Sequence, residues 1–244
     1  MYNAMIHPLV RFPIKGALWY QGESNGGEGD GYCDKMRALI GGWRKQWGGG
    51  DFPFYFVQLA NFQGANENPA GGDGWARVRA AQNKALAIPD TGMAVIIDIG
   101  EANDIHPRNK YDVGARLARW ALARDYGQKD VVVSGPLFRE MKIEGDKARL
   151  CFDHAAPGLM VGKKDGRAPA VENKDGKLRR FAVAGTDKVW QWAEAVIDGE
   201  TVVVSSPKVK EPVAVRYAFS MNPEGANLYN REGLPASPFR TDNW

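Results

Sequence analysis

Cysteine and histidine, the residues from which disulfide frameworks and most metal sites are built, are scarce in this sequence. There are 2 cysteines and 3 histidines among 244 residues. Cys33 and Cys151 cannot form a disulfide framework, and neither they nor the isolated histidines have the spacing of a metal site. We therefore expect no metal and no cofactor.

Long apolar runs and a strong excess of one charge are also absent. No apolar stretch approaches the roughly 20 residues that a membrane-spanning helix needs, so we expect no membrane partner. The net charge is only +3 and the basic residues are scattered, whereas a nucleic-acid-binding face would cluster them. Hydrophobic residues make up 44% and charged residues 25% of the chain. These are ordinary globular values, which exclude disorder, a coiled coil and a collagen-like rod.

What the sequence does have, over residues 1–134, is an alternation of apolar and amphipathic segments. The short apolar runs that predict buried strands are 16–20, 52–60, 93–99 and 131–133. The 3.6-residue periods that predict helices cover 32–47, 75–86 and 111–126, and helical spacing without a signal-peptide pattern also occurs at 2–9. Apolar strands separated by helices indicate an α/β fold, with a parallel sheet covered on both faces.

The pattern changes after residue 134. Short segments rich in valine and aromatic residues predict strands at 147–152, 178–183, 189–197, 201–205 and 213–219. Asp-Gly pairs, which are hairpin signals, occur at 165–166, 175–176 and 198–199. We therefore predict two domains, 1–134 and 135–244. The second is predicted to be an antiparallel β-sandwich, with an irregular tail from residue 222 that is held by the apolar residues Leu228, Tyr229, Leu234 and Phe239.

Polar residues follow three of the predicted parallel strands, at the edge where reactive groups gather in such sheets. They are Gln21–Asn25, Asn61 and Asp98–His106. A histidine with a carboxylate close by, as Asp104 is to His106, is how a general base is held in one tautomer. The alternative is that His106 is a surface residue that caps the following helix. His7 and His154 have no such company, and we interpret them as structural.

Residues 22–26 match the pattern G-x-S-x-G of the nucleophile elbow in α/β-hydrolases. The elbow needs its serine on a tight strand-to-helix turn, whereas a glycine-rich run separates Ser24 from the next predicted helix. We therefore prefer to interpret Ser24 as a loop serine and keep its role as nucleophile as the alternative.

Two blocks of sequence resemble a known family. Residues 19–25 read WYQGESN and residues 104–110 read DIHPRNK. Together with residues 2–6, 227–230 and 235–240, they are similar to the sialate O-acetylesterase family of SGNH-type hydrolases. The resemblance implies a flavodoxin-like parallel sheet followed by a β domain. It also implies hydrolysis of O-acetyl esters on carbohydrates, typically on sialic acid.

The resemblance further implies roles for individual residues. His106 would be the base that deprotonates the nucleophile and later protonates the leaving sugar. Gln21 would donate an N–H to the tetrahedral oxyanion, and Glu23 and Asn25 would support its loop. The substrate would be an acetylated sugar. If that sugar is sialic acid, its carboxylate favours an arginine near the site, and the candidates are Arg77, Arg79 and Arg108.

The sequence departs from the family pattern at the residue that orients the base. SGNH enzymes commonly place an aspartate three residues before the histidine, where this sequence has Asn103. Asp104 is our candidate for that role, with Asp98, Glu101 or a backbone carbonyl as alternatives.

The larger departure concerns the nucleophile. The family's serine belongs to a Gly-Gln-Ser-Asn-like block on the first strand, and no such block occurs in these residues. From the resemblance we expect the chain to match the carboxyl-terminal half of such an enzyme, with a preceding segment or a second chain supplying the serine. We expect little activity from the chain alone. The family is usually exported, which implies an extracellular or periplasmic location for an intact member. A non-catalytic sugar-binding fragment and a complete hydrolase that uses Ser24 are the alternative functions.

Overall fold

A three-stranded parallel sheet forms the centre of the α/β half. In the computed structural model, which describes residues 2–244, its strands are β1 (Ala17–Trp19), β2 (Phe54–Val57) and β3 (Thr91–Ala94), in the order β1-β2-β3. Both pairings are parallel, so the carboxyl ends of the three strands lie at one edge of the sheet.

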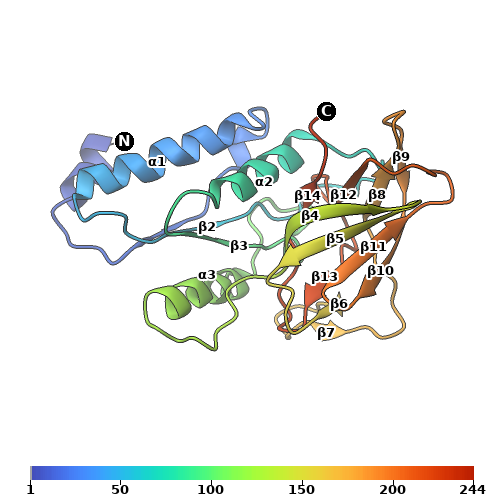
Figure 1. Ribbon diagram of the computed structural model, residues 1–244. Coiled ribbons are helices and arrows are strands. Elements are labelled where there is room, and N and C mark those ends of the chain that lie inside the picture. The colour runs from blue at the N-terminus through green and yellow to red at the C-terminus, as the bar shows by residue number, and fades with distance from the viewer. Residues whose placement is uncertain (1) are drawn as a thin grey trace.

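Helices cover both faces of this sheet (Figure 1). Helices α1 (Gly31–Trp47) and α2 (Gly74–Ala85) pack on one face, and α3 (Lys110–Arg124) packs on the other. On β2, Phe54 and Phe56 contact the α1–α2 side, while Tyr55 and Val57 contact the α3 side, as the two-residue period of a strand requires. The predicted parallel sheet with helices on both faces is therefore confirmed.

The helix ends follow from local chemistry. Gly48 ends α1 in the left-handed conformation, with φ of 66°. Asp73 caps α2 by accepting from the Ala76 N–H, and Asn109 caps α3 by accepting from the Asp112 N–H. Short helical turns lie at η1 (Tyr2–Ile6, a π-helix), η2 (His7–Leu9) and η3 (Glu23–Asn25).

Several predicted strands are wrong in extent, as at 52–60, where only Phe54–Val57 pairs, and one is absent. The strand predicted at 93–99 pairs only as far as Ala94. Beyond this point the segment after β2 no longer pairs with it, because the Leu59 N–H donates to Gln82 Oε1. The strand predicted at 131–133 is absent, and the Val132 carbonyl accepts from Arg119 Nη1. Both segments are apolar because they are buried or partly buried, and burial alone does not imply pairing in a sheet.

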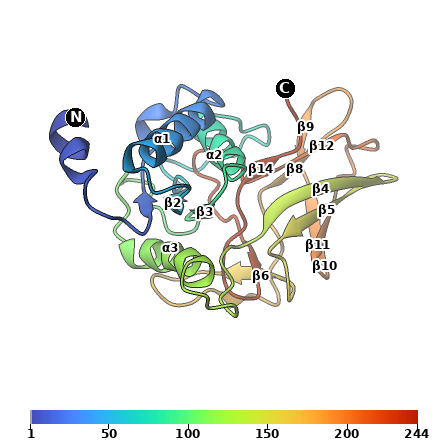
Figure 2. The same ribbon diagram turned by 60° about the vertical axis from the view of Figure 1, so that its left-hand side comes forward.

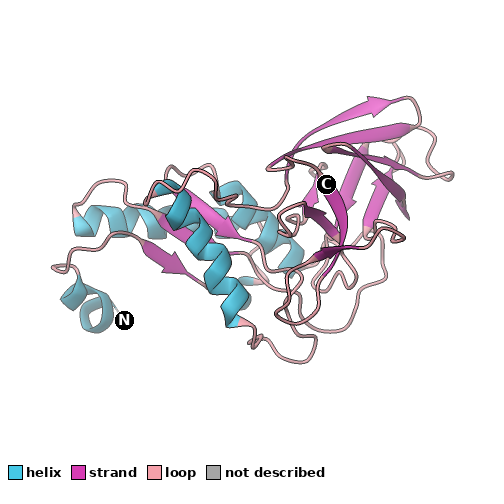
Figure 3. Ribbon diagram, turned by 90° about the horizontal axis from the view of Figure 1, so that it is seen from below, coloured by secondary structure: helices cyan, strands magenta, loops and turns pink. Residues whose placement is uncertain are grey.

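The second half consists of antiparallel sheets (Figure 3). Two sheets have four strands each, in the orders β10-β11-β5-β4 and β14-β12-β8-β9, and a third has the order β13-β6-β7. The strands are β4 (Leu137–Glu144), β5 (Lys147–Asp153), β6 (Leu159–Lys163), β7 (Val171–Glu172), β8 (Phe181–Ala184), β9 (Trp190–Trp192), β10 (Glu194–Asp198), β11 (Thr201–Ser205), β12 (Ala214–Tyr217), β13 (Leu228–Asn230) and β14 (Phe239–Arg240).

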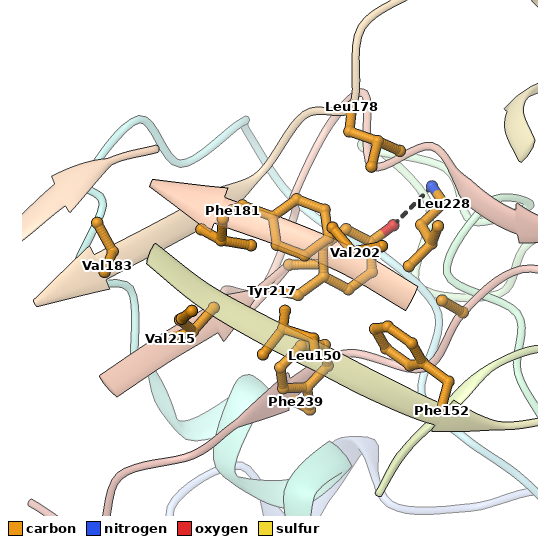
Figure 4. Close-up of a cluster of buried hydrophobic side chains, with 14 of the residues drawn as sticks. Leu150, Phe152, Leu178, Phe181, Val183, Val202, Val215, Tyr217, Leu228 and Phe239 are labelled. Carbon is orange, nitrogen blue, oxygen red and sulfur yellow. Dashed lines mark hydrogen bonds between the residues drawn. The ribbon is translucent and has the colours of Figure 1, made fainter. Parts of the chain in front are cut away.

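One hydrophobic core lies between these sheets (Figure 4). Leu150 of β5 packs with Phe181, Tyr217 and Phe239 of the opposite sheet, and the Phe181 and Tyr217 rings lie 4.6 Å apart. The Tyr217 hydroxyl accepts the main-chain N–H of Leu228 at 3.0 Å, so this buried phenol is satisfied. Antiparallel sheets that share one core agree with the sandwich predicted from the sequence.

The carboxyl-terminal tail packs back on the α/β half. The predicted anchors Leu228, Tyr229, Leu234 and Phe239 are all buried. β14 lies near α2 in Figures 1 and 2, and Asn83 of α2 donates to the Pro238 carbonyl at 2.8 Å. The tail that the sequence pattern groups with the second half therefore also stabilises the first.

Candidate active site

The loop after β1 holds the side chain of Gln21 in one orientation. Gln21 Nε2 donates to Asn25 Oδ1 at 2.6 Å. The Tyr32 hydroxyl lies 2.9 Å from the main-chain oxygen of Gln21 and 3.1 Å from its Oε1, and donates toward both. One Nε2 hydrogen is thereby engaged, and the second remains to donate to another acceptor.

This loop depends on a glycine. Gly22 has φ of 146°, a conformation that residues with a side chain rarely adopt. A Cβ at this position would also lie 3.2 Å from Leu59 Cδ2 and 3.3 Å from the Tyr32 hydroxyl.

Within residues 2–244 the Glu23 side chain takes part in no hydrogen bond. Burial of the Tyr20 phenol raises the pKa of Tyr20 to about 12, and the Glu23 carboxylate contributes to this shift.

Ser24 lies in η3 and is exposed. Helix α1 does not begin until Gly31, so this serine does not sit on the direct strand-to-helix turn of a nucleophile elbow. No hydrogen bond of its hydroxyl occurs with another residue in the part of the chain that the structure describes. The geometry agrees with the interpretation of Ser24 as a loop serine.

Asn61 and Arg79 hold the segment after β2. Asn61 Oδ1 accepts the Gly100 N–H at 2.8 Å, which ties this segment to the loop after β3. The guanidinium of Arg79 is fully buried. It donates to the carbonyls of Leu59, Ala60, Ser220 and Met221 at distances of 2.6 to 2.8 Å. Burial lowers the pKa of Arg79 to about 9. Arg79 is therefore a structural residue and does not face a substrate.

Two carboxylates that were alternatives for orienting His106 are engaged elsewhere. Asp98 is buried and forms two hydrogen bonds with Arg116, at 2.6 and 2.8 Å. Glu101 accepts from the guanidinium of Arg108, with a shortest distance of 2.6 Å. These hydrogen bonds from Arg108 lower the pKa of Glu101 to about 2. Arg108, predicted to bind substrate, is thus fixed next to the His106 loop, and its Nη1 is not used by Glu101.

The imidazole of His106 is 87% exposed. Its Nδ1 lies 3.9 Å from Asp104 Oδ1, which is too long for a hydrogen bond. The same Asp104 oxygen instead accepts the main-chain N–H of His106 at 2.8 Å. Asp104 therefore shapes the backbone of the loop in this structure, and its predicted role in orienting the ring stays a prediction.

The sheet brings the Gln21 and His106 loops to the same edge. Gln21 lies two residues beyond the end of β1, and His106 follows β3, which is parallel to β1 through β2. Both loops also meet one hydrophobic cluster under α1 and α2, because Tyr32 of this cluster hydrogen-bonds Gln21 and Ile105 packs against it. The carboxyl edge therefore carries an oriented amide donor and an imidazole, which are the groups that acyl transfer requires beside a nucleophile.

A cavity of about 410 Å³ opens at this edge and was not anticipated from the sequence. Asn61 and Asp98 line it from the α/β half, and Tyr229 and several basic residues line it from the β half. Sequence periodicity holds no signal for such a cavity, because it forms between segments that are distant along the chain.

Across residues 2–244 there is no group of histidine, cysteine and carboxylate side chains that could hold a metal ion. No helix in this range is long and apolar enough to span a membrane.

Comparison with known proteins identifies the family. The family model described as carbohydrate esterase, sialic acid-specific acetylesterase, matches residues 1–123 of the 244. The chain belongs to this family. The resemblance predicted from the two sequence blocks is thereby confirmed, and the family match covers both candidate loops.

Relatives of this acetylesterase-family chain extend the likeness beyond residue 123. The sialate O-acetylesterases of Rattus norvegicus and Homo sapiens are each 30% identical over 98% of the chain, which covers 46% and 48% of those proteins. A crystal structure of a carbohydrate acetylesterase from Xanthomonas citri is 46% identical, with a TM-score of 0.89, and covers all of this chain and 54% of that one. The chain thus spans about half the length of the relatives it matches.

Proposed function

We propose that this chain supplies the general base and an oxyanion-stabilising amide of a carbohydrate O-acetylesterase that acts on O-acetylated sialic acid. The observation that carries the proposal is the common sheet edge of the Gln21 and His106 loops. Membership in the acetylesterase family supports the reaction class.

In the first half of the proposed reaction, His106 accepts the proton of a serine hydroxyl as that oxygen attacks the acetyl carbonyl carbon. The carbonyl oxygen becomes an oxyanion in the tetrahedral intermediate. The Nε2 hydrogen of Gln21 that is not used by Asn25 donates to this oxyanion. Because Tyr32 and Asn25 already fix the amide, the donor needs little rearrangement.

In the second half, the intermediate expels the sugar oxygen, which takes the proton from His106. Water then attacks the acetyl-serine with His106 as base, and acetate leaves as the serine is restored. Asn25 supports the Gln21 loop, Asp104 holds the backbone of the His106 loop, and Arg108 offers its free Nη1 to the substrate.

We infer that the serine comes from residues outside these 244, either a preceding segment or a second chain. Ser24 is exposed and lies well before α1, which argues against it as the nucleophile. The edge strand β1 also presents Leu18, which is 65% exposed. A further element packed beside β1 would bury that side chain.

The test is hydrolysis of p-nitrophenyl acetate and of O-acetylated N-acetylneuraminic acid by the purified chain. We expect turnover at the buffer rate from the chain alone. Mixing it with the segment of the Xanthomonas citri relative that it does not match is expected to produce activity. In that mixture, His106→Ala should abolish turnover, and Gln21→Ala should lower kcat by about 10²–10³-fold.

Two results would support rival functions. Turnover by the chain alone that Ser24→Ala removes would identify a complete serine hydrolase. Binding of acetylated sugar with no turnover in the mixture would identify a sugar-binding fragment, a function that the exposed and unoriented ring of His106 favours. Faster hydrolysis of acetylated xylan than of the sialic acid ester would replace the proposed substrate and keep the reaction.

A further inference from the structure

We propose that the cavity at the carboxyl edge binds the carboxylate of an acidic sugar through Lys163, Lys177 and Arg179. The cavity measures about 410 Å³, which is within the usual range for small-molecule sites. It lies between the two halves of the molecule. Asn61 and Asp98 belong to the segments after β2 and β3, and the three basic residues belong to β6 and to the segment before β8.

The charges that line this cavity are unequal. Within residues 2–244, Lys163, Lys177 and Arg179 form no ion pair, and all three are exposed. The other lining cation, Lys164, pairs with Asp112 at 2.7 Å.

The negative groups of the lining do not neutralise these cations. Asp98 is paired with Arg116. Glu224 lines the cavity, and its carboxylate has no partner in the described part of the chain. Three cations therefore face one unpaired carboxylate, and the excess positive charge favours an anionic ligand.

The remaining lining favours a sugar over an apolar ligand. Asn173 lines the cavity, and its side-chain amide forms no hydrogen bond within residues 2–244, whereas the amides of Asn61 and Asn227 are used inside the protein. A free amide can donate to and accept from the hydroxyls of a sugar. We therefore assign the ligand to the class of carboxylated sugars, which includes uronic acids and sialic acids.

None of the arginines that the sequence offered for this role lines the cavity. Arg79 is buried against four carbonyls, Arg108 is paired with Glu101, and Arg77 donates to the Gly72 carbonyl at 3.2 Å. The unpaired cations that line the cavity all belong to the β half.

The cavity adjoins the proposed catalytic loop. Lys164 of the lining pairs with Asp112 in the first turn of α3, and Asn109 donates to the Gly166 carbonyl at 3.4 Å. These contacts connect the β6–β7 segment to the residues that directly follow His106. As a subsite for substrate, this assignment rests on the proposed function, but binding of the acidic sugar can be measured without any ester.

The experiment is calorimetric or NMR titration of the 244-residue chain with trigalacturonate, N-acetylneuraminate, a neutral galactose trimer and acetate. We expect both acidic sugars to bind at low ionic strength, with weaker binding at high salt. The Lys177→Gln/Arg179→Gln variant should weaken binding about tenfold or more. Lys174→Gln is the matched control, because Lys174 is exposed in the same segment and does not line the cavity.

The Glu224→Gln variant is expected to change the affinity in the opposite direction. It removes the unpaired carboxylate of the lining, so binding should tighten about two- to threefold, a gain that misfolding cannot imitate. Binding by one acidic sugar alone would identify which source of carboxylate the cavity accepts. The proposal would be overturned if neither acidic sugar bound, or if the neutral trimer or acetate bound equally well. Equal losses in the double variant and in Lys174→Gln would also overturn it. Hydrolysis of a neutral acetyl ester in the complemented mixture is a separate measurement, so the two proposals fail independently.

Discussion

The loops after β1 and β3 reach the same sheet edge but are held by opposite means. In the first, the functional side chain is fixed, because neutral hydrogen bonds from Tyr32 and to Asn25 orient the Gln21 amide. In the second, carboxylates fix the backbone, and the ring of His106 projects into solvent. An oxyanion donor is effective only when it is already aligned. The difference indicates that the amide proposed as oxyanion donor is already aligned, while the ring proposed as base has no side-chain contact that orients it in the described residues.

The largest loss of stability should come from breaking the Arg116–Asp98 ion pair beneath the loop after β3. Arg116→Met leaves the buried Asp98 carboxylate without its partner. Removing one member of a buried pair costs about 3–5 kcal/mol of unfolding free energy, which urea unfolding would measure. Arg124→Met on the exposed last turn of α3 is the control and should change stability by less than about 0.5 kcal/mol. Similar losses in both variants would contradict the buried-pair account.

A smaller effect is expected in the first loop. Tyr32→Phe removes the hydroxyl that donates to Gln21, which should lower the unfolding free energy by about 1 kcal/mol. It should also accelerate amide hydrogen exchange in residues 21–25 while leaving residues 101–106 unchanged. Equal acceleration in both loops would mean that they are not held separately.

The third expectation concerns pH. Arg108 lowers the pKa of Glu101 from 4.5 to about 2. The carboxylate therefore stabilises the folded loop above pH 4.5, and this contribution is lost as the pH falls toward 2. Because the pair is exposed, we expect a small effect that salt weakens. The stability difference between wild type and Glu101→Gln should shrink across this pH window, and a difference that stays constant would argue against the pairing.

The smallest effect on stability should come from the most important residue of the proposed reaction. The ring of His106 is 87% exposed, so His106→Ala should change the unfolding free energy by less than about 0.5 kcal/mol. The same variant should abolish hydrolysis in the complemented mixture. A loss of several kcal/mol on thermal or urea unfolding would show that the ring supports the fold.

Periodicity predicted the elements better than their ends. The helices at 32–47, 75–86 and 111–126 start and end within two residues of α1, α2 and α3, because an amphipathic face is visible in the sequence. The strand predicted at 93–99 was too long, because apolar residues beyond Ala94 are buried without pairing. β5 was predicted at 147–152, but its hairpin partner β4 was missed, because the turn between them is Gly145–Asp146, the reverse of the expected Asp-Gly order.

The candidate site was predictable only to the level of the loops. Sequence order placed polar residues after parallel strands, which is sufficient to predict their common edge. It could not reveal that Asp104 accepts a main-chain N–H, because Asp-x-His spacing is the same whichever group donates. The cavity of Lys177 and Arg179 depends on tertiary contacts between the halves, and no local pattern encodes such contacts.

The buried guanidinium of Arg79 has a consequence for dissecting the molecule. It joins the carbonyls of Leu59 and Ala60 to those of Ser220 and Met221, which lie 141 and 142 positions after Arg79 in the chain. A cut at the predicted boundary near residue 134 would separate these acceptors and leave the buried guanidinium with only half of its hydrogen bonds. The two halves should therefore be expressed and engineered as one chain.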